Sequence, residues 1–273
     1  MPLKIALIQQ KNGKDKKENT DRALKAARQA ASQGAQIICF PELAFEPFYP
    51  QHPKPQNRLS LAEPIPGPTT ELFAGLAKEL GVVFVLNLFE RAGQQAYDSA
   101  PLIDADGSIL GVTRMMHITQ YEGFYEQDYY DPGDTGAPVY QTAFGKIGVA
   151  ICYDRHYPEY MRALALKGAQ IVFIPQAGAL GEWPEGLYEA EVRVASFQNG
   201  YFTALCNRVG REDALEFSGG SFVSDPFGQI IARAPMGQES ILFADIDLDR
   251  IAASPAKQLF LRHRRAELYK TWF

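Results

Sequence analysis

A single cysteine, Cys152, stands where an apolar run gives way to a polar turn. The run, 146–151, is typical of a buried strand, and the turn opens an amphipathic segment, 160–167, that is typical of a helix. A thiol at a helix start lies beside free backbone N–H groups, which favour the nucleophilic thiolate. The alternative is a buried cysteine that serves as a small hydrophobic side chain. The two interpretations differ in whether the chain also supplies a base.

A candidate base is Glu42, which follows Pro41 at the end of a second apolar run, 37–40. Proline lacks an N–H and therefore helps to end a strand. A carboxyl group buried at such a strand end has a raised pKa, which suits it to take the proton of a thiol. The alternative is a glutamate at a loop start that faces water. None of the four histidines lies in a sequence context that predicts a base for the thiol.

The elements that must position these residues alternate between strands and helices. We expect strands at 3–8, 37–40, 82–88, 100–103, 108–115, 139–142, 146–151, 170–175, 202–206, 220–223, 230–233 and 240–245. We expect helices at 21–32, 69–80, 160–167 and 184–198, a proline-rich loop over 45–68 and a tyrosine-rich loop over 118–138. Such alternation, interrupted by hairpins, predicts a layered α/β domain with mixed sheets.

Composition narrows the class of protein. The chain has 273 residues, is 46% hydrophobic and carries a net charge of -5, which gives no nucleic-acid footprint. No stretch has the pattern of a secretory signal or the length of a membrane span. The three cysteines are scattered, which argues against a disulfide framework or a zinc site. We therefore expect a cytoplasmic protein with no metal.

Four short segments, in this order, resemble the nitrilase superfamily of carbon–nitrogen hydrolases. They are Pro41-Glu42-Leu43, Arg114-Met115-Met116-His117, Tyr125-Glu126 ahead of the turn at 131–134, and Ile151-Cys152-Tyr153-Asp154. The resemblance runs from about residue 3 to 247. It implies one domain over 1–273, folded as a four-layer α-β-β-α sandwich with mixed sheets that pairs into a homodimer or higher homo-oligomer. The tail, 248–273, is a possible part of that interface.

The resemblance also implies the roles of particular residues. Glu42 is the general base, Cys152 the nucleophile and Glu126 a second catalytic glutamate. The backbone N–H of Tyr153 belongs to the oxyanion hole, and no metal or organic cofactor takes part. The family's catalytic lysine corresponds to Met115, and no lysine stands between Lys78 and Lys146.

Methionine at position 115 removes a charge and a hydrogen-bond donor, because a thioether supplies neither. The loss of one oxyanion-hole donor costs about 3–4 kcal/mol of transition-state stabilisation. Without the cation, two glutamates in one dry site raise each other's pKa, so we hypothesise that Glu126 is protonated at neutral pH. His117 is a candidate for part of the missing donation, and Arg114 is expected on the opposite face of the strand.

The turn after the cysteine resembles that of N-carbamoyl amino-acid amidohydrolases and β-ureidopropionases. In those enzymes an arginine at the position of Arg155 binds the substrate carboxylate, which suits a guanidinium with two parallel donors. We therefore assign Arg155 and His117 to substrate binding. The alternative for Arg155 is a bracing ion pair with Asp154 or Glu159.

The sequence thus predicts a cysteine-dependent hydrolase of amides or N-carbamoyl amino acids. Two alternatives remain open. One is a catalytically impaired or inactive binding protein on the same scaffold, which Met115 favours. The other is an acyltransferase that passes the acyl group from Cys152 to an acceptor other than water.

Overall fold

The computed structural model describes residues 2–53 and 55–272 and contains two large mixed sheets. The first sheet has the strand order β15-β1-β2-β3-β5-β4, with β6 paired to β5. Its strands are β1 (Leu3–Gln9), β2 (Ile37–Cys39), β3 (Val83–Val85), β4 (Leu88–Ala92), β5 (Gln95–Ile103), β6 (Ile109–Arg114) and β15 (Ser240–Ile246). Strands β1, β2 and β3 are parallel neighbours, whereas β15 and β5 pair antiparallel at either side.

The second sheet has the order β14-β13-β10-β9-β8-β7. Its strands are β7 (Val139–Thr142), β8 (Gly145–Val149), β9 (Ile171–Gln176), β10 (Phe202–Asn207), β13 (Phe222–Ser224) and β14 (Ile230–Arg233). Strands β8, β9 and β10 are parallel in its middle. A separate hairpin joins β11 (Val209–Glu212) to β12 (Leu215–Ser218).

Alternating side chains of each strand divide between two cores, which stacks the molecule in layers. In β1, Leu3, Ile5 and Leu7 enter the core between the sheets, whereas Ala6 and Ile8 face the helices outside. This follows from the two-residue period of a strand. The expected α-β-β-α sandwich is therefore confirmed.

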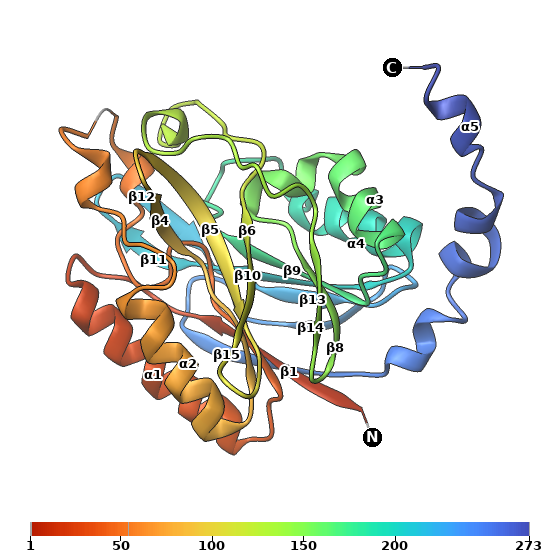
Figure 1. Cartoon of the computed structure of the whole chain (residues 1–273), viewed down its shortest axis with the longest axis horizontal. Helices are drawn as coiled ribbons and strands as arrows, with labels where there is room; N and C mark the ends of the chain where they lie inside the picture. Colours follow the sequence, from red (N-terminus) through yellow and green to blue (C-terminus); the bar gives the residue numbers. More distant parts are fainter. Residues whose placement is uncertain (1, 54, 273) are drawn as a thin grey trace.

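Four helices cover the outer faces of the two sheets (Figure 1). Helices α1 (Lys16–Ser32) and α2 (Pro68–Leu80) pack on the first sheet, and α3 (Pro158–Leu166) and α4 (Leu187–Asn199) on the second. Helix α1 begins earlier than the expected residue 21. The reason is Asp15, whose side chain accepts from the N–H groups of Lys17 and Glu18 and caps a polar first turn.

The C-terminal tail leaves the sandwich after β15 (Figure 1). It continues through short helical turns to α5 (Ala266–Tyr269). The ring of Phe260 contacts that of Phe197 on α4, with centroids 5.4 Å apart. No helix in the described ranges is long and apolar enough to cross a membrane.

Candidate active site

Cys152 occupies a strained turn directly after β8. Its φ angle is 41°, a left-handed backbone conformation that residues other than glycine rarely adopt. The residue opens a 3-10 helix, Cys152–His156, in which the N–H of Asp154 donates to the carbonyl of Ile151 at 2.8 Å. Strain of this kind persists only where surrounding contacts impose it, and it gathers at functional sites.

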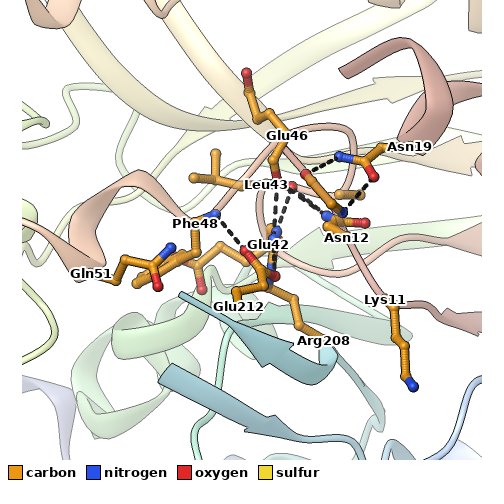
Figure 2. Close-up of polar contacts among 12 residues, drawn as sticks. Lys11, Asn12, Asn19, Glu42, Leu43, Glu46, Phe48, Gln51, Arg208 and Glu212 are labelled. Carbon is orange, nitrogen blue, oxygen red and sulfur yellow. Dashed lines mark hydrogen bonds and ion pairs between the residues drawn. The ribbon is translucent and has the colours of Figure 1, made fainter. Parts of the chain in front are cut away.

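Glu42 follows the end of β2 and is completely buried. The next residue, Leu43, also has a left-handed φ of 45°, and its N–H donates to Oδ1 of Asn87 at 2.7 Å. Figure 2 shows Arg208 reaching this turn from the second sheet, where its Nη1 donates to the carbonyls of Glu42 (2.7 Å) and Leu43 (2.5 Å). Glu212 pairs with the same guanidinium. The backbone that carries Glu42 is thus held from two sheets.

Glu126 comes from the tyrosine-rich loop, at the start of a 3-10 helix, Glu126–Asp128. It is also completely buried, and its Oε2 accepts from the N–H of Thr119 at 3.2 Å. The ligand atoms of Glu42, Glu126 and Cys152 lie within 4.8 Å of one another. Three segments that are distant in the sequence therefore bring two carboxyl groups to one thiol.

Burial dominates the electrostatics of this trio. Burial, and after it the neighbouring Glu126, raises the pKa of Glu42 to about 8. Burial likewise raises the pKa of Glu126 well above its usual range. The pKa of the Cys152 thiol is raised by burial and then by Glu42 and Glu126. At neutral pH the two glutamates therefore keep protons that they would lose in water, and the thiol keeps its own.

The expectation that the helix start favours a thiolate at Cys152 is wrong for the resting site. Helix α3 begins only at Pro158, beyond the 3-10 turn, so its N–H groups do not surround the sulfur. The buried carboxyl groups of Glu42 and Glu126 lie close to the sulfur, and they oppose a negative charge on it. Cys152 is a thiol at rest and needs a base during the reaction.

Asp154 and His117 connect the end of β6 to the nucleophile turn. The buried carboxylate of Asp154 accepts from the N–H groups of Met116 (3.2 Å) and His117 (3.1 Å). Nδ1 of His117 lies 2.7 Å from the same carboxylate, and its ring stacks on Tyr157 at 3.5 Å. One side of the His117 ring is therefore already engaged, which leaves its part in substrate binding a prediction.

Arg155 is almost fully buried and is bonded within the protein. Its Nη1 donates to the carbonyl of Cys152 (2.7 Å) and to Oε1 of Gln176 (2.9 Å), and its Nε lies 3.2 Å from Glu191 on α4. The bracing partner is thus Glu191, not Asp154 or Glu159, because the side chain turns toward α4 and away from α3. Nη2 has no partner among the described residues.

Sequence reasoning missed two acidic residues near the trio. Asp98 on β5 is completely buried, accepts from Nδ2 of Asn87 at 2.5 Å, and stands within hydrogen-bond reach of Glu42. Glu182 accepts from the hydroxyls of Tyr121 (2.5 Å) and Tyr188 and from Nε1 of Trp183 (3.0 Å). No local signal marked Asp98, because Gln95 and Ser99 make the surrounding part of β5 polar.

Comparison with known proteins agrees with this geometry. The family model described as carbon-nitrogen hydrolase matches residues 4–256. The chain belongs to the carbon–nitrogen hydrolase family. N-carbamoylputrescine amidase of Solanum lycopersicum is 37% identical over 97% of this chain and 93% of its own length. Beta-ureidopropionase of Arabidopsis thaliana is 34% identical over 88% of this chain and 63% of its own length.

The same relation holds among solved structures. The crystal structure of a carbon-nitrogen hydrolase from Helicobacter pylori G27 has a TM-score of 0.93 and 32% identity, and it covers 100% of this chain and 98% of that one. An amidase from Nesterenkonia has a TM-score of 0.84 and 28% identity, with 99% and 100% covered. The resemblance to the nitrilase superfamily is confirmed.

Within this carbon–nitrogen hydrolase, Met115 is completely buried directly after β6. It belongs to the same apolar core as Cys152. Arg114 turns the other way, as expected, and pairs with Glu90 (2.6 Å) and Asp134 (2.9 Å). Neither residue supplies the trio with a cation. By spacing alone, the ligand atoms of Glu42, Glu126 and Cys152 would admit a cation among them.

Proposed function

We propose that this carbon–nitrogen hydrolase cleaves a non-peptide C–N bond through an acyl-enzyme on Cys152, with a simple amide or a terminal ureido (N-carbamoyl) group as substrate. The observation that supports it is the convergence of Glu42, Glu126 and Cys152 within 4.8 Å in a buried site. A buried thiol beside an acceptor carboxyl group is the arrangement that nucleophilic catalysis requires.

Glu42 takes the proton of the Cys152 thiol as the sulfur attacks the carbonyl carbon. The backbone N–H of Tyr153 donates to the developing oxyanion. Glu42 then passes the proton to the departing nitrogen, and the C–N bond breaks to leave the acyl group on sulfur. Water that gives a proton to Glu42 hydrolyses this intermediate. Glu126, protonated in the resting site, donates a hydrogen bond to the substrate.

Two relatives support the ureido class. One is named for N-carbamoylputrescine and the other for beta-ureidopropionate hydrolysis, and both names denote compounds with an N-carbamoyl group. The internal bonds of Arg155 support a bracing role, and its Nη2, which has no hydrogen-bond partner among the described residues, is the donor that a substrate carboxylate would need. Three free cysteines fit a reducing, cytoplasmic compartment.

The test is a substrate panel of N-carbamoyl amino acids, N-carbamoylputrescine, simple amides and nitriles. Ammonia release measures turnover, and intact mass measures the acyl adduct on Cys152. We expect release from amide or ureido members and an adduct at early times. A protein that releases ammonia from no member of the panel, and gains no mass, would exclude the proposal.

Met115 favours a second candidate, a catalytically impaired binding protein on the same scaffold. A thioether leaves the oxyanion with one donor fewer. If this candidate holds, the wild-type protein binds ureido compounds without turnover, and Met115→Lys creates activity. If the wild-type protein already turns them over, the candidate is excluded.

A further inference from the structure

The trio of Glu42, Glu126 and Cys152 has buried oxygen atoms that no N–H group or hydroxyl among the described residues serves. These atoms are both oxygens of Glu42 and Oε1 of Glu126; the nearest groups to Glu42 are the Cys152 thiol and the Asp98 carboxyl group, within hydrogen-bond reach. A buried carboxyl group without partners is costly, so such atoms point to a bound group that satisfies them. Asp98, with its Oδ2 also lacking a donor, stands behind Glu42 and adds to the acidic character.

The cations around the site are already bonded to other groups. Arg208 donates to backbone carbonyls and to the carboxylate of Glu212. Arg155 donates to the carbonyl of Cys152 and pairs with Glu191. Position 115, from which the family's lysine would enter, carries an apolar side chain. Protons balance these carboxyl groups at rest, and no cation among the described residues is free to replace them. A cation that displaces those protons must therefore come from outside the described chain.

A neutral carbonyl substrate supplies no such cation. Attack by sulfur turns its oxygen into an anion beside two carboxyl groups, with one donor fewer than the family provides. An amidinium or guanidinium group has the opposite behaviour, because attack neutralises a positive charge and creates no oxyanion. Its planar N–H donors also match carboxylate acceptors through paired hydrogen bonds.

We propose that the preferred scissile group of this site is a cationic amidinium or guanidinium, held between Glu42 and Glu126 for attack by Cys152. This inference uses the same nucleophile and base as the proposed function and changes the group on which they act. The spacing of the three ligand atoms, within 4.8 Å, allows one carbon to lie against the sulfur while its nitrogens reach both carboxyl groups.

The reaction balances without any further reactant than water. The thiol proton of Cys152 passes to Glu42 as the C–S bond forms, and the C=N electron pair moves to nitrogen. Glu42 returns the proton to one nitrogen, the C–N bond breaks, and ammonia leaves. Water then attacks the S-linked cationic carbon and gives a proton to Glu42. As the C–S bond breaks, Glu42 returns this proton to sulfur, and the remaining O–H proton of the product passes to the ammonia. A guanidinium thereby yields a ureido product and ammonium.

The experiment compares matched pairs that differ only in the scissile group. The pairs are 4-guanidinobutyrate with 4-ureidobutyrate, and agmatine with N-carbamoylputrescine, each measured by ammonia release. We expect kcat/KM to be about tenfold or more higher for the guanidinium member, since charge-assisted hydrogen bonds are roughly twice as strong as neutral ones. A faster ureido member overturns the inference and leaves the proposed function standing. If neither member releases ammonia and the protection test described below also fails, the inference is overturned.

Met115→Lys is expected to reverse the preference, because the new cation repels a guanidinium and donates to an oxyanion. Met116→Lys is the matched control, since it adds the same side chain one position along on a partly exposed residue. It should leave the ratio between the two members unchanged. An unchanged ratio in Met115→Lys as well would contradict the inference.

A second measurement does not depend on the rest of the substrate. Acetamidinium chloride and acetamide are compared, at equal ionic strength, as protectants of Cys152 against alkylation by iodoacetamide, which peptide mass analysis reports. We expect acetamidinium to slow alkylation several-fold more than acetamide. Equal protection, or none, counts against the cationic site whatever the panel shows.

Discussion

Nη1 of Arg155 donates to the carbonyl oxygen of Cys152 at 2.7 Å, so this cation is bonded to the backbone of the nucleophile and not to its sulfur. The bond closes the turn in which Cys152 has a φ of 41°. Gln176 on β9 accepts from the same Nη1, and Glu191 on α4 lies 3.2 Å from Nε of the guanidinium. A strained nucleophile turn is thus fixed by one buried side chain that spans the sheet edge and a helix.

Arg155→Lys is expected to lower kcat/KM by about tenfold or more for carboxylate-bearing and neutral substrates alike. A lysine cannot reproduce the planar fork that serves two acceptors and an ion pair at once. The measurement is kcat/KM for an N-carbamoyl amino acid and a neutral amide of similar size. A loss confined to KM of the carboxylate substrate would instead show that Nη2 binds the substrate.

Cys152→Ala should abolish turnover, with a loss of at least about a thousandfold in kcat, because the covalent step has no substitute. Cys206→Ala is the matched control: this buried cysteine contacts the carbonyls of Ile8 and Cys39, away from the trio. It should lower stability and keep the acyl adduct. Residual turnover by Cys152→Ala at the wild-type rate would exclude the nucleophile assignment.

The pH dependence of turnover should show a base with an unusually high pKa. Glu42, whose pKa is raised to about 8, must lose its proton to accept that of the thiol. For a neutral ureido or amide substrate, kcat/KM is therefore expected to rise with pH and level off above about 8. Glu126→Gln should leave the rise in place, because a protonated Glu126 and a glutamine are both neutral; a shift to lower pH would show that Glu126 is ionised at rest. A flat profile from pH 6 to 9 would contradict this role.

The outer face of the second sheet should pair two copies of the chain. Exposed apolar side chains gather on its helices, among them Leu166 of α3 (51% exposed) and Val194 of α4 (50%). A patch of this kind is typical of an interface. Light scattering should give twice the chain mass for the wild type and the mass of one chain for Val194→Asp, with Leu72→Asp on α2 as the control. A monomeric wild type would rule out this pairing.

Much of the fold followed from hydrophobic periodicity. The strand Leu3–Gln9 and the helix Pro68–Leu80 lie close to their expected positions, because their apolar spacing has one clear period. The N-terminal half of β5 was missed. Its sequence includes Asp98 and Ser99, which are buried because Asn87 and Glu90 on neighbouring segments bond to them. Such compensation depends on tertiary contacts that a local pattern does not contain.

The candidate site was predictable in its residues and in the raised pKa of its two glutamates, but not in the neighbours that surround them. The ordered motifs identified Glu42, Glu126 and Cys152 as candidates, and the structure places them together. The acidic neighbour Asp98 and the internal bonding of Arg155 required the fold. Both depend on strands that are distant in the sequence.

The buried carboxyl groups also make the stability of the folded protein depend on pH, because they keep protons that the unfolded chain loses. Glu42 has a folded-state pKa of about 8 against 4.5 in water, so between these values the folded chain binds more protons than the unfolded chain. Its free energy of unfolding should therefore fall as pH rises from about 4.5 to about 8 and lose no more from this group above that. Glu42→Gln should flatten this slope, which denaturant unfolding at a series of pH values measures. The contribution of Glu42 to stability is thus largest in mild acid, whereas turnover of a neutral substrate requires alkaline pH.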